Sequence, residues 1–330
     1  MVWFCLGLAY LFEFANGWTD APNSIATVVS TRVMRPHHAV LMAAAMNLIG
    51  ALVVGTAVAE TIAEGIVNPD YVGLDTVASA LLAATLWAVA AQAFGLPSSE
   101  SHALIAGLLG AGFAAGGLQA LESEGTQAAL VGLVTSPVGG FLMGLVLMVL
   151  IYRFFHRVRR ALITRVFGKA QVGSAAFMAF SHGTNDAQKT MGIIALTIAL
   201  NEAGTAGNVE DLTIDLWMIV SAALVMGLGT MVGGWRVVRT MGMRMTRLEP
   251  VQGFAAETGA ATVITAAASI GIPVSTTHAI GSAIMGVGAT KRFSAVRWGV
   301  AGQVVAAWVL TWPSCALLGY LFQKAFSLFS

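Results

Sequence analysis

Six ionisable side chains lie inside long apolar segments of this sequence: Glu13, Asp20, Glu100, Asp186, Lys189 and Glu257. Placing such a group in hydrocarbon costs about 2.5–3.5 kcal/mol on insertion scales, so each is a candidate functional residue. Carboxylate and amide oxygens suit a hard cation, and a carboxylate can also carry a proton. We therefore expect an interior cation or proton site formed by Asp20, Asn23, Asn185, Asp186 and Glu257.

A structural role is the alternative for the two aspartates, each of which could pair with Lys189 or cap a half-helix. Lys189 follows Asp186 by three residues, so on a helix the two side chains share a face. This spacing is compatible with two roles for Lys189, which either neutralises a carboxylate or attracts an anion. We expect the cation site to be modulated by Glu100, Gln188, Lys189 and Asn47.

Two other apolar segments are interrupted by a proline and a cluster of hydroxyl side chains, Pro97-Ser-Ser-Glu-Ser101 and Pro273-Val-Ser-Thr-Thr277. Proline suits the first turn of a helix, and Ser or Thr suits its cap. A break here would aim the free N–H groups and the positive dipole end of a new helix into the centre of the segment, which makes an anion site. We expect anion contacts from Ser98, Ser99, Ser101, Ser275, Thr276 and Thr277.

The simpler interpretation of these hydroxyl clusters is that they cap kinked helices and bond to neighbouring helices. Because both halves of the chain carry the pattern, we favour the anion site. His102 and His278 follow Ser99 and Ser275 by three residues. A lone pair of histidines is a weak metal signal, so we expect these two to orient the hydroxyl loops.

The composition indicates what kind of protein holds these motifs. The chain has 330 residues, of which 57% are hydrophobic and 10% charged, whereas an ordinary soluble domain has roughly 25% charged residues. This deficit excludes a disordered chain and a soluble enzyme, and argues against a nucleic-acid partner. We expect a protein that crosses the lipid bilayer many times, with no cofactor other than a coupling ion.

The charged residues are segregated along the chain. Fifteen of the 17 basic residues lie in Arg32–Arg35, Arg153–Lys169, Arg236–Arg247 and Lys291–Arg297. Ten of the 16 acids lie in Glu60–Asp75, Glu122–Glu124 and Glu202–Asp215. Because basic loops stay in the cytoplasm, we expect a multi-pass protein of the plasma (inner) membrane with both termini outside and the segment 152–171 in the cytoplasm.

The two halves of the sequence repeat each other, in two motifs that keep their order. At one constant offset, Phe14, Gly17, Asp20 and Ala21 recur as Phe180, Gly183, Asp186 and Ala187. At a slightly larger offset, Gly95, Pro97, Ser99, His102 and Ala103 recur as Gly271, Pro273, Ser275, His278 and Ala279. We expect a first repeat at 1–151, a basic linker at 152–171 and a second repeat at 172–330.

Since each half crosses the membrane an odd number of times, the second repeat should be upside down relative to the first. The predicted fold is an all-α polytopic membrane protein, an inverted-topology repeat transporter with two re-entrant or broken-helix hairpins. The sequence leaves open whether 97–117 and 273–290 re-enter or span the membrane.

The same motifs resemble those of the inorganic phosphate transporter (PiT) family, especially its bacterial low-affinity branch. The stretches that carry the resemblance are Gly17–Thr27, Pro97–Ile105, His182–Lys189 and Gly271–His278. The resemblance implies phosphate uptake coupled to protons or sodium, often by a homodimer. It also implies roles for Asp20, Asn23, Asp186, Glu257 and the hydroxyl loops. If sodium is the coupling ion, its ligands are expected to be Asp20, Asn23 and Asp186. Glu100 stands where similar bacterial members usually have Asn, which puts the charge of the substrate and the coupling ion in question.

We therefore expect a symporter of inorganic phosphate, not an enzyme, that works by alternating access. A sulfate or other oxyanion permease on the same scaffold is the nearest alternative, and a passive channel is another. An intramembrane hydrolase using Ser99 with His102, or Ser275 with His278, belongs to a different class. Duplicated identical motifs suit a symmetric binding site better than a single nucleophile and its base.

Overall fold

The computed structural model describes residues 1–53, 55–203 and 213–328. This part of the chain is helical and contains no β-strand, as the sequence predicts. The α-helices are α1 (Val2–Ser30), α2 (Pro36–Val53), α3 (Ala57–Glu64), α4 (Leu74–Phe94), α5 (Glu100–Gly116), α6 (Ser123–Phe155), α7 (Arg160–Ala203), α8 (Leu216–Val232), α9 (Trp235–Arg239), α10 (Pro250–Ala268), α11 (Thr276–Ala289) and α12 (Trp298–Phe326). Three short helices complete the described part: the 3₁₀-helices η1 (Gly117–Ala120) and η3 (Phe293–Ala295) and the π-helix η2 (Thr240–Arg244).

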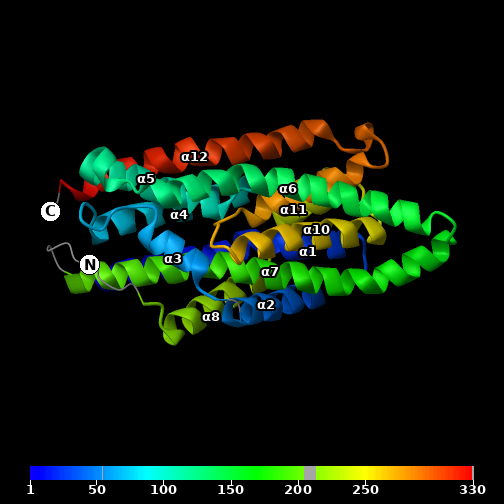
Figure 1. Cartoon of the computed structure of the whole chain (residues 1–330), viewed down its shortest axis with the longest axis horizontal. Coiled ribbons are helices and arrows are strands. Elements are labelled where there is room, and N and C mark those ends of the chain that lie inside the picture. Colours follow the sequence, from blue (N-terminus) through cyan, green and yellow to red (C-terminus); the bar gives the residue numbers. More distant parts are fainter. Residues whose placement is uncertain (54, 204–212, 329–330) are drawn as a thin grey trace.

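The helices form an elongated bundle (Figure 1). By length and apolarity alone, the described helices α2, α4, α5 with η1, α6 and α12 could each cross a membrane, and α8 with the bent α9–η2 segment could be a sixth span. The two helices that carry the aspartate motifs, α1 and α7, do not meet this test. Both have polar residues in their central turns, which lowers their hydropathy. These polar turns are buried inside the bundle.

Both predicted breaks are present. α4 is followed by its cap residue Gly95, and α10 is followed by Gly271. These two glycines have φ angles of +67° and +72°, a conformation that residues with a Cβ rarely adopt. Pro97 and Pro273 lie in the non-helical residues that follow. α4–α5 and α10–α11 are therefore helix–break–helix hairpins. In Figure 1, the first hairpin lies in the half of the molecule nearer the termini and the second in the opposite half.

The two halves of the chain exchange packing partners. α1 packs on α8 while α7 packs on α2, and α5 packs on α12 while α11 packs on α6. Repeat partners run in opposite directions along the long axis, α1 against α7 and α6 against α12 (Figure 1). This antiparallel arrangement supports the predicted inversion.

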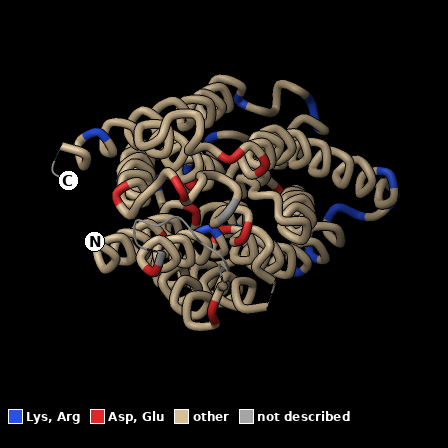
Figure 2. Tube along the Cα trace, turned by 60° about the vertical axis from the view of Figure 1, so that its left-hand side comes forward, with Lys and Arg blue, Asp and Glu red and all other residues tan. Residues whose placement is uncertain are grey.

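The charges follow the long axis. The start of α1 and the end of α12 lie at one end of the molecule, and the turn between α6 and α7 lies at the other (Figure 1). Most Lys and Arg residues lie on the side away from the termini, whereas Asp and Glu lie in the interior and toward the termini (Figure 2). Most of the segment 152–171 is helical, because α6 ends at Phe155 and α7 begins at Arg160. Part of the acidic stretch Glu202–Asp215 lies outside the described residues.

Glycine lets the hairpins approach their partner helices closely. A Cβ at Gly110 of α5 would lie 2.0 Å from the carbonyl oxygen of Ala316 in α12, and one at Gly286 of α11 would lie 2.2 Å from that of Phe141 in α6. Gly110 and Gly286 occupy equivalent positions in the two repeats. Small residues allow such close helix contacts in membranes, where packing is a main source of stability.

We predict that Gly286→Ala destabilises the protein by about 1–3 kcal/mol, because the added methyl group forces α11 away from α6. Thermal unfolding of the purified protein in detergent measures the change. Gly302→Ala is the matched control, since Gly302 of α12 is exposed and a Cβ added to it would have no atom within 4 Å. Equal melting temperatures for the two variants would contradict the close contact.

Candidate functional site

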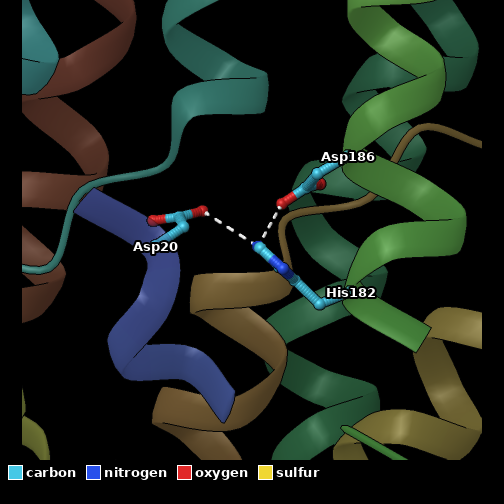
Figure 3. A group of neighbouring side chains, drawn as sticks. All are labelled: Asp20, His182 and Asp186. Carbon is cyan, nitrogen blue, oxygen red and sulfur yellow. Dashed lines mark ion pairs between the residues drawn. The ribbon is translucent and has the colours of Figure 1, made fainter. Parts of the chain in front are cut away.

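The site lies where α1 and α7 pass between the two breaks. Asp20 of α1 and Asp186 of α7 point toward His182, which is one helical turn before Asp186 (Figure 3). The His182 Nε2 atom is 2.9 Å from Asp186 Oδ2 and 3.9 Å from Asp20 Oδ2. All three side chains are buried. The two aspartates that the repeat relates are therefore brought together, as the sequence predicts for partners in one site.

The first turn of α11, which follows the second break, supplies hydroxyl groups to both aspartates. The Thr276 hydroxyl donates to Asp186 Oδ2 at 2.9 Å and lies 3.5 Å from Asp20 Oδ2. Thr277 donates to Asp20 Oδ1 at 3.1 Å. The amide nitrogen of Asn23 donates to the Thr276 hydroxyl at 3.2 Å and to the Thr277 hydroxyl at 2.9 Å. One cluster thus contains residues that we predicted for the cation site and residues that we predicted for the anion site.

The first break meets the second at the same place. The Ser101 hydroxyl donates to the carbonyl oxygen of Val274 at 3.2 Å. Lys189 of α7 donates to the Ser101 hydroxyl and to Asp186 Oδ1, and lies 3.5 Å from the Val274 carbonyl. The Asn185 amide also donates to Asp186 Oδ1, at 2.7 Å, and to the Val274 carbonyl, at 2.9 Å. The two breaks are therefore joined through α7.

Glu100 is buried beside the first break. Its Oε1 atom accepts from Thr19 of α1 at 3.0 Å and from Ser98 at 3.1 Å. Its Oε2 atom is buried and has no hydrogen-bond partner among the described residues. The Ser98 hydroxyl proton therefore points to a carboxylate in this structure, and Glu100 retains one oxygen that can accept a further hydrogen bond.

Ser99 and Ser275 cap the two helices that start at the breaks. Each side chain accepts a hydrogen bond from the backbone N–H three residues later, at His102 and His278 respectively. The two imidazole rings lie behind the caps with their centroids 4.7 Å apart, and the His278 ring stacks on Trp308. This packing agrees with the expected positioning role of the histidines. The capped N-termini of α5 and α11 provide N–H groups and positive dipole ends at the site.

The predicted modulators hold neighbouring elements in place. Asn47 of α2 lies 3.3 Å from His182 Nδ1 and donates to Thr230 at 3.0 Å. Gln188 Oε1 accepts from the backbone N–H of Val58 at 2.9 Å, which ties α7 to the first turn of α3. Asn47 therefore orients the histidine between the aspartates, and Gln188 fixes α3.

Glu257 lies in a different cluster from the two aspartates. It accepts from Thr27 at 2.5 Å and from Gln171 at 3.1 Å, and it also accepts from Ser174. Thr27 is seven residues after Asp20 on α1, which corresponds to about 10 Å along the helix axis. Glu13, seven residues before Asp20, is fully buried and accepts from Thr190. Two further carboxylates therefore flank the central site along α1.

Two open cavities lead toward the breaks. One cavity, which we call the acidic vestibule, has a volume of about 510 Å³ and is lined by Glu60, Glu122, Glu124 and Gly271, among others. The other cavity, which we call the basic vestibule, has a volume of about 390 Å³ and is lined by Gly95, Arg236, Arg239 and Arg244, among others.

A single threonine holds the glycine of each break. Thr61 donates to the Gly271 carbonyl at 2.8 Å, and Thr240 donates to the Gly95 carbonyl, also at 2.8 Å. The two vestibules thus reach equivalent glycines of the two repeats.

His182 and Thr19 are the site residues that the sequence analysis missed. His182 precedes Asp186 by four residues, so a helix places both on one face. That spacing and the rarity of buried histidine were the available signals. Thr19 gave no signal, because its contact with Glu100 joins residues 81 positions apart.

Two sets of side-chain atoms in this arrangement could bind a cation. One oxygen from each aspartate and one nitrogen of His182 lie within 4.8 Å of one another, a spacing that a metal ion could bridge. The Asp186 carboxylate is already surrounded by donors, whereas the side-chain oxygens of Asn23, Ser24 and Asn185 are buried without a hydrogen-bond partner among the described residues. Acceptor oxygens without donors are suited to a hard cation such as Na⁺.

The chain is similar to several known proteins. Residues 16–319 match the model of the phosphate transporter family. The chain is 46% identical to a probable low-affinity inorganic phosphate transporter of Rhizobium meliloti (strain 1021), over 96% of this chain and 93% of the relative. It is 40% identical to a protein of the same description from Bacillus subtilis (strain 168), over 94% of this chain and 92% of the relative. The solved structure of a sodium-dependent phosphate transporter superposes with a TM-score of 0.90 over 99% of both chains, at 24% identity.

Proposed function

Because the chain belongs to the phosphate transporter family, we propose that it moves inorganic phosphate across the membrane in symport with a cation or proton. The observation that carries this proposal is the meeting of two capped helix N-termini, those of α5 and α11, beside two buried carboxylates. A helix N-terminus attracts an anion and a carboxylate attracts a cation. The site is thus suited to binding both at once, which symport requires.

In this proposal, phosphate binds between the two breaks. Its oxygens would accept from the first-turn N–H groups of α5 and α11 and from the hydroxyls of Ser99, Ser101, Ser275, Thr276 and Thr277. In the present structure, the hydroxyls of Thr276 and Thr277 donate to the aspartates. A hydroxyl has one proton to donate, so phosphate and the aspartates compete for it. A cation at Asp20 would relieve this competition by taking the place of the hydroxyl protons.

The coupling ion compensates the charge of the interior. Asp20, Glu100 and Asp186 are three carboxylates, and the side chains beside them that can carry a positive charge are Lys189 and His182, among the described residues. Like charges a few ångströms apart repel by several kcal/mol at the effective dielectric constant of a protein. An anion therefore enters this site only together with a cation or proton. By linkage, bound phosphate tightens the cation site by the same factor.

Alternating access would use the two vestibules. The acidic vestibule concentrates cations near the second break, and the basic vestibule concentrates phosphate near the first. In this structure the site between them is buried. We propose that the hydrogen bonds from Thr61 to Gly271 and from Thr240 to Gly95 open alternately, exposing the site to one vestibule at a time. Opposite motions of two inverted repeats would produce such an exchange.

The remaining features of the proposal concern the setting of the transporter. We place it in the plasma (inner) membrane with both termini outside and the turn between α6 and α7 in the cytoplasm, because the basic residues gather there. We further propose a homodimer that needs no cofactor beyond the coupling ion. The hydrolase alternative lacks support, because the ring nitrogens of His102 and His278 have no hydrogen-bond partner among the described residues and so cannot activate Ser99 or Ser275.

We predict that Asp20→Asn and Asp186→Asn each lower concentrative uptake of radiolabelled phosphate to below about a tenth of the wild-type rate, since a lost charge contact of about 1.4 kcal/mol or more changes affinity at least tenfold. Uptake is measured in proteoliposomes with the sodium and pH gradients varied independently. Asp70→Asn, in an exposed turn, is the control. Full uptake by both site variants would overturn the proposal.

Glu100 provides a means of choosing phosphate over sulfate. Near neutral pH phosphate carries at least one P–OH group, whereas sulfate carries no proton. The unpartnered Oε2 of Glu100 can accept a hydrogen bond from that P–OH group. It would repel sulfate, which offers nothing to satisfy it. Sites that hydrogen-bond a substrate hydroxyl reject analogues that lack it.

We predict that Glu100→Gln strengthens the inhibition of labelled phosphate uptake by sulfate at least tenfold relative to wild type, because the glutamine amide can donate to sulfate and has no charge. The measurement is the sulfate concentration that halves uptake at fixed phosphate. Glu202→Gln, at an exposed position at the end of α7, is the control. An unchanged sulfate inhibition in a variant that still transports phosphate would exclude this role of Glu100.

A further inference from the structure

We infer that the ammonium group of Lys189 is a built-in cation that occupies one of two equivalent cation positions, so that only the position at Asp20 takes a dissociable ion. This inference rests on the proposed function and specifies its stoichiometry. It starts from the internal repeat. The alignment of the two halves that pairs Asp20 with Asp186 also pairs Asn23 with Lys189. The alignment that pairs Pro97 with Pro273 likewise pairs Ser101 with Thr277.

The contacts of the two halves correspond in the same way. In the first half, the side chain of Asn23 contacts the Thr277 hydroxyl of the opposite hairpin at 2.9 Å. In the second half, the side chain of Lys189 contacts the Ser101 hydroxyl, which is the repeat partner of Thr277. An amide and an ammonium group therefore occupy equivalent places between an aspartate-bearing helix and the opposite break.

Both carboxylate oxygens of Asp186 have partners, whereas the side-chain oxygen of Asn185 next to it is buried and has no hydrogen-bond partner among the described residues. The Oδ1 atom of Asp186 accepts from Lys189 and from Asn185, and its Oδ2 atom lies 2.9 Å from both His182 Nε2 and the Thr276 hydroxyl. Lys189 is 1% exposed, and Asp186 is the acid it pairs with among the described residues. Such a buried pair has no need of a further cation, because the lysine supplies the positive charge and the donors.

The surroundings of Asp20 are incomplete by comparison. Its contacts are hydroxyls at 3.1 and 3.5 Å and the His182 ring at 3.9 Å. Next to it, Asn23 Oδ1 and Ser24 Oγ are buried and have no hydrogen-bond partner among the described residues. The first half therefore presents a carboxylate and neutral oxygens without donors, a ligand set for a hard monovalent cation. In the second half, the charge that such an ion would bring is attached to the chain.

A fixed cation changes the transport cycle in a defined way. Two dissociable ions would each have to bind before phosphate and be released after it, whereas Lys189 remains in place throughout. The number of ions that uptake requires, and the positive charge that moves with each phosphate, are then lower by one than in a site with an asparagine at both positions. Lys189 is in this sense the residue that sets the stoichiometry.

The test is to replace Lys189 by the residue at the equivalent position of the first half. Lys189→Asn removes the fixed charge and adds an amide oxygen, which recreates the ligand set of Asn23. Phosphate uptake into proteoliposomes is measured against sodium concentration at constant pH and ionic strength, with choline as the replacement cation. We expect the Hill coefficient for sodium to rise by about one relative to wild type, whether the wild type is driven by sodium or by protons, because one additional site must be filled.

Three further variants make the test specific. Lys189→Met removes the charge without adding an oxygen ligand, and should lose uptake without acquiring a sodium requirement. Asn23→Lys places a fixed cation at the first position and should lower the Hill coefficient for the coupling ion by one. The double exchange, Asn23→Lys with Lys189→Asn, should recover uptake relative to Asn23→Lys alone, because it again provides one fixed and one dissociable cation.

Binding to the purified protein provides a readout that does not require transport. Sodium, compared with choline, should raise the melting temperature of Lys189→Asn more than that of wild type, since a ligand that binds only the folded state stabilises it. An unchanged Hill coefficient together with an unchanged sodium-induced shift would overturn the role of Lys189. If wild-type protein still takes up phosphate, the proposed function survives that result. Failure of the wild type to take up phosphate would overturn the proposed function itself.

Discussion

Charge compensation in an apolar interior is the constraint on which the rest of this structure depends. Asp20, Glu100, Asp186 and Lys189 are all buried in a helical bundle. An unpaired charge there is costly, and the breaking of a buried pair typically costs about 3–5 kcal/mol. Asp186 is compensated by Lys189 and its neighbouring donors. Asp20 and Glu100 retain acceptor capacity that the protein itself does not fill. In the proposed function, this unfilled acceptor capacity is the reason why the interior binds ions.

The fold places these charges by breaking two helices at equivalent positions. Gly95 and Gly271 turn the chain out of the helix, and Ser99 and Ser275 start the next one. The glycines at 110 and 286 then let each hairpin pack tightly on the last helix of a repeat. As a result, Thr276 and Thr277 reach the aspartate of the first half, while Ser101 reaches the lysine of the second. These binding groups come from the opposite repeat, which couples motions of the two halves to the state of the site.

The sequence predicts the local parts of this arrangement well. Pro97 and Pro273 with the serines that follow them determine the breaks and caps, because capping depends on residues only three positions apart. The equivalence of Asp20 and Asp186 could likewise be read from the repeat. The contact of Thr19 with Glu100 and the orientation of His182 by Asn47 could not, since both depend on how helices pack. Glu257 shows the same limit: its burial was predictable, but not its placement with Thr27, Gln171 and Ser174 instead of with the aspartates.

The central claim is that one anion binds between the two helix N-termini, in contact with both repeats. A structure of the protein determined with arsenate, an electron-dense analogue of phosphate, measures this most directly. We expect one density peak within hydrogen-bonding distance of the N-terminal turns of both α5 and α11, adjacent to Asp20 and Lys189. A peak that contacts only one hairpin, or that lies away from both breaks, would contradict the claim.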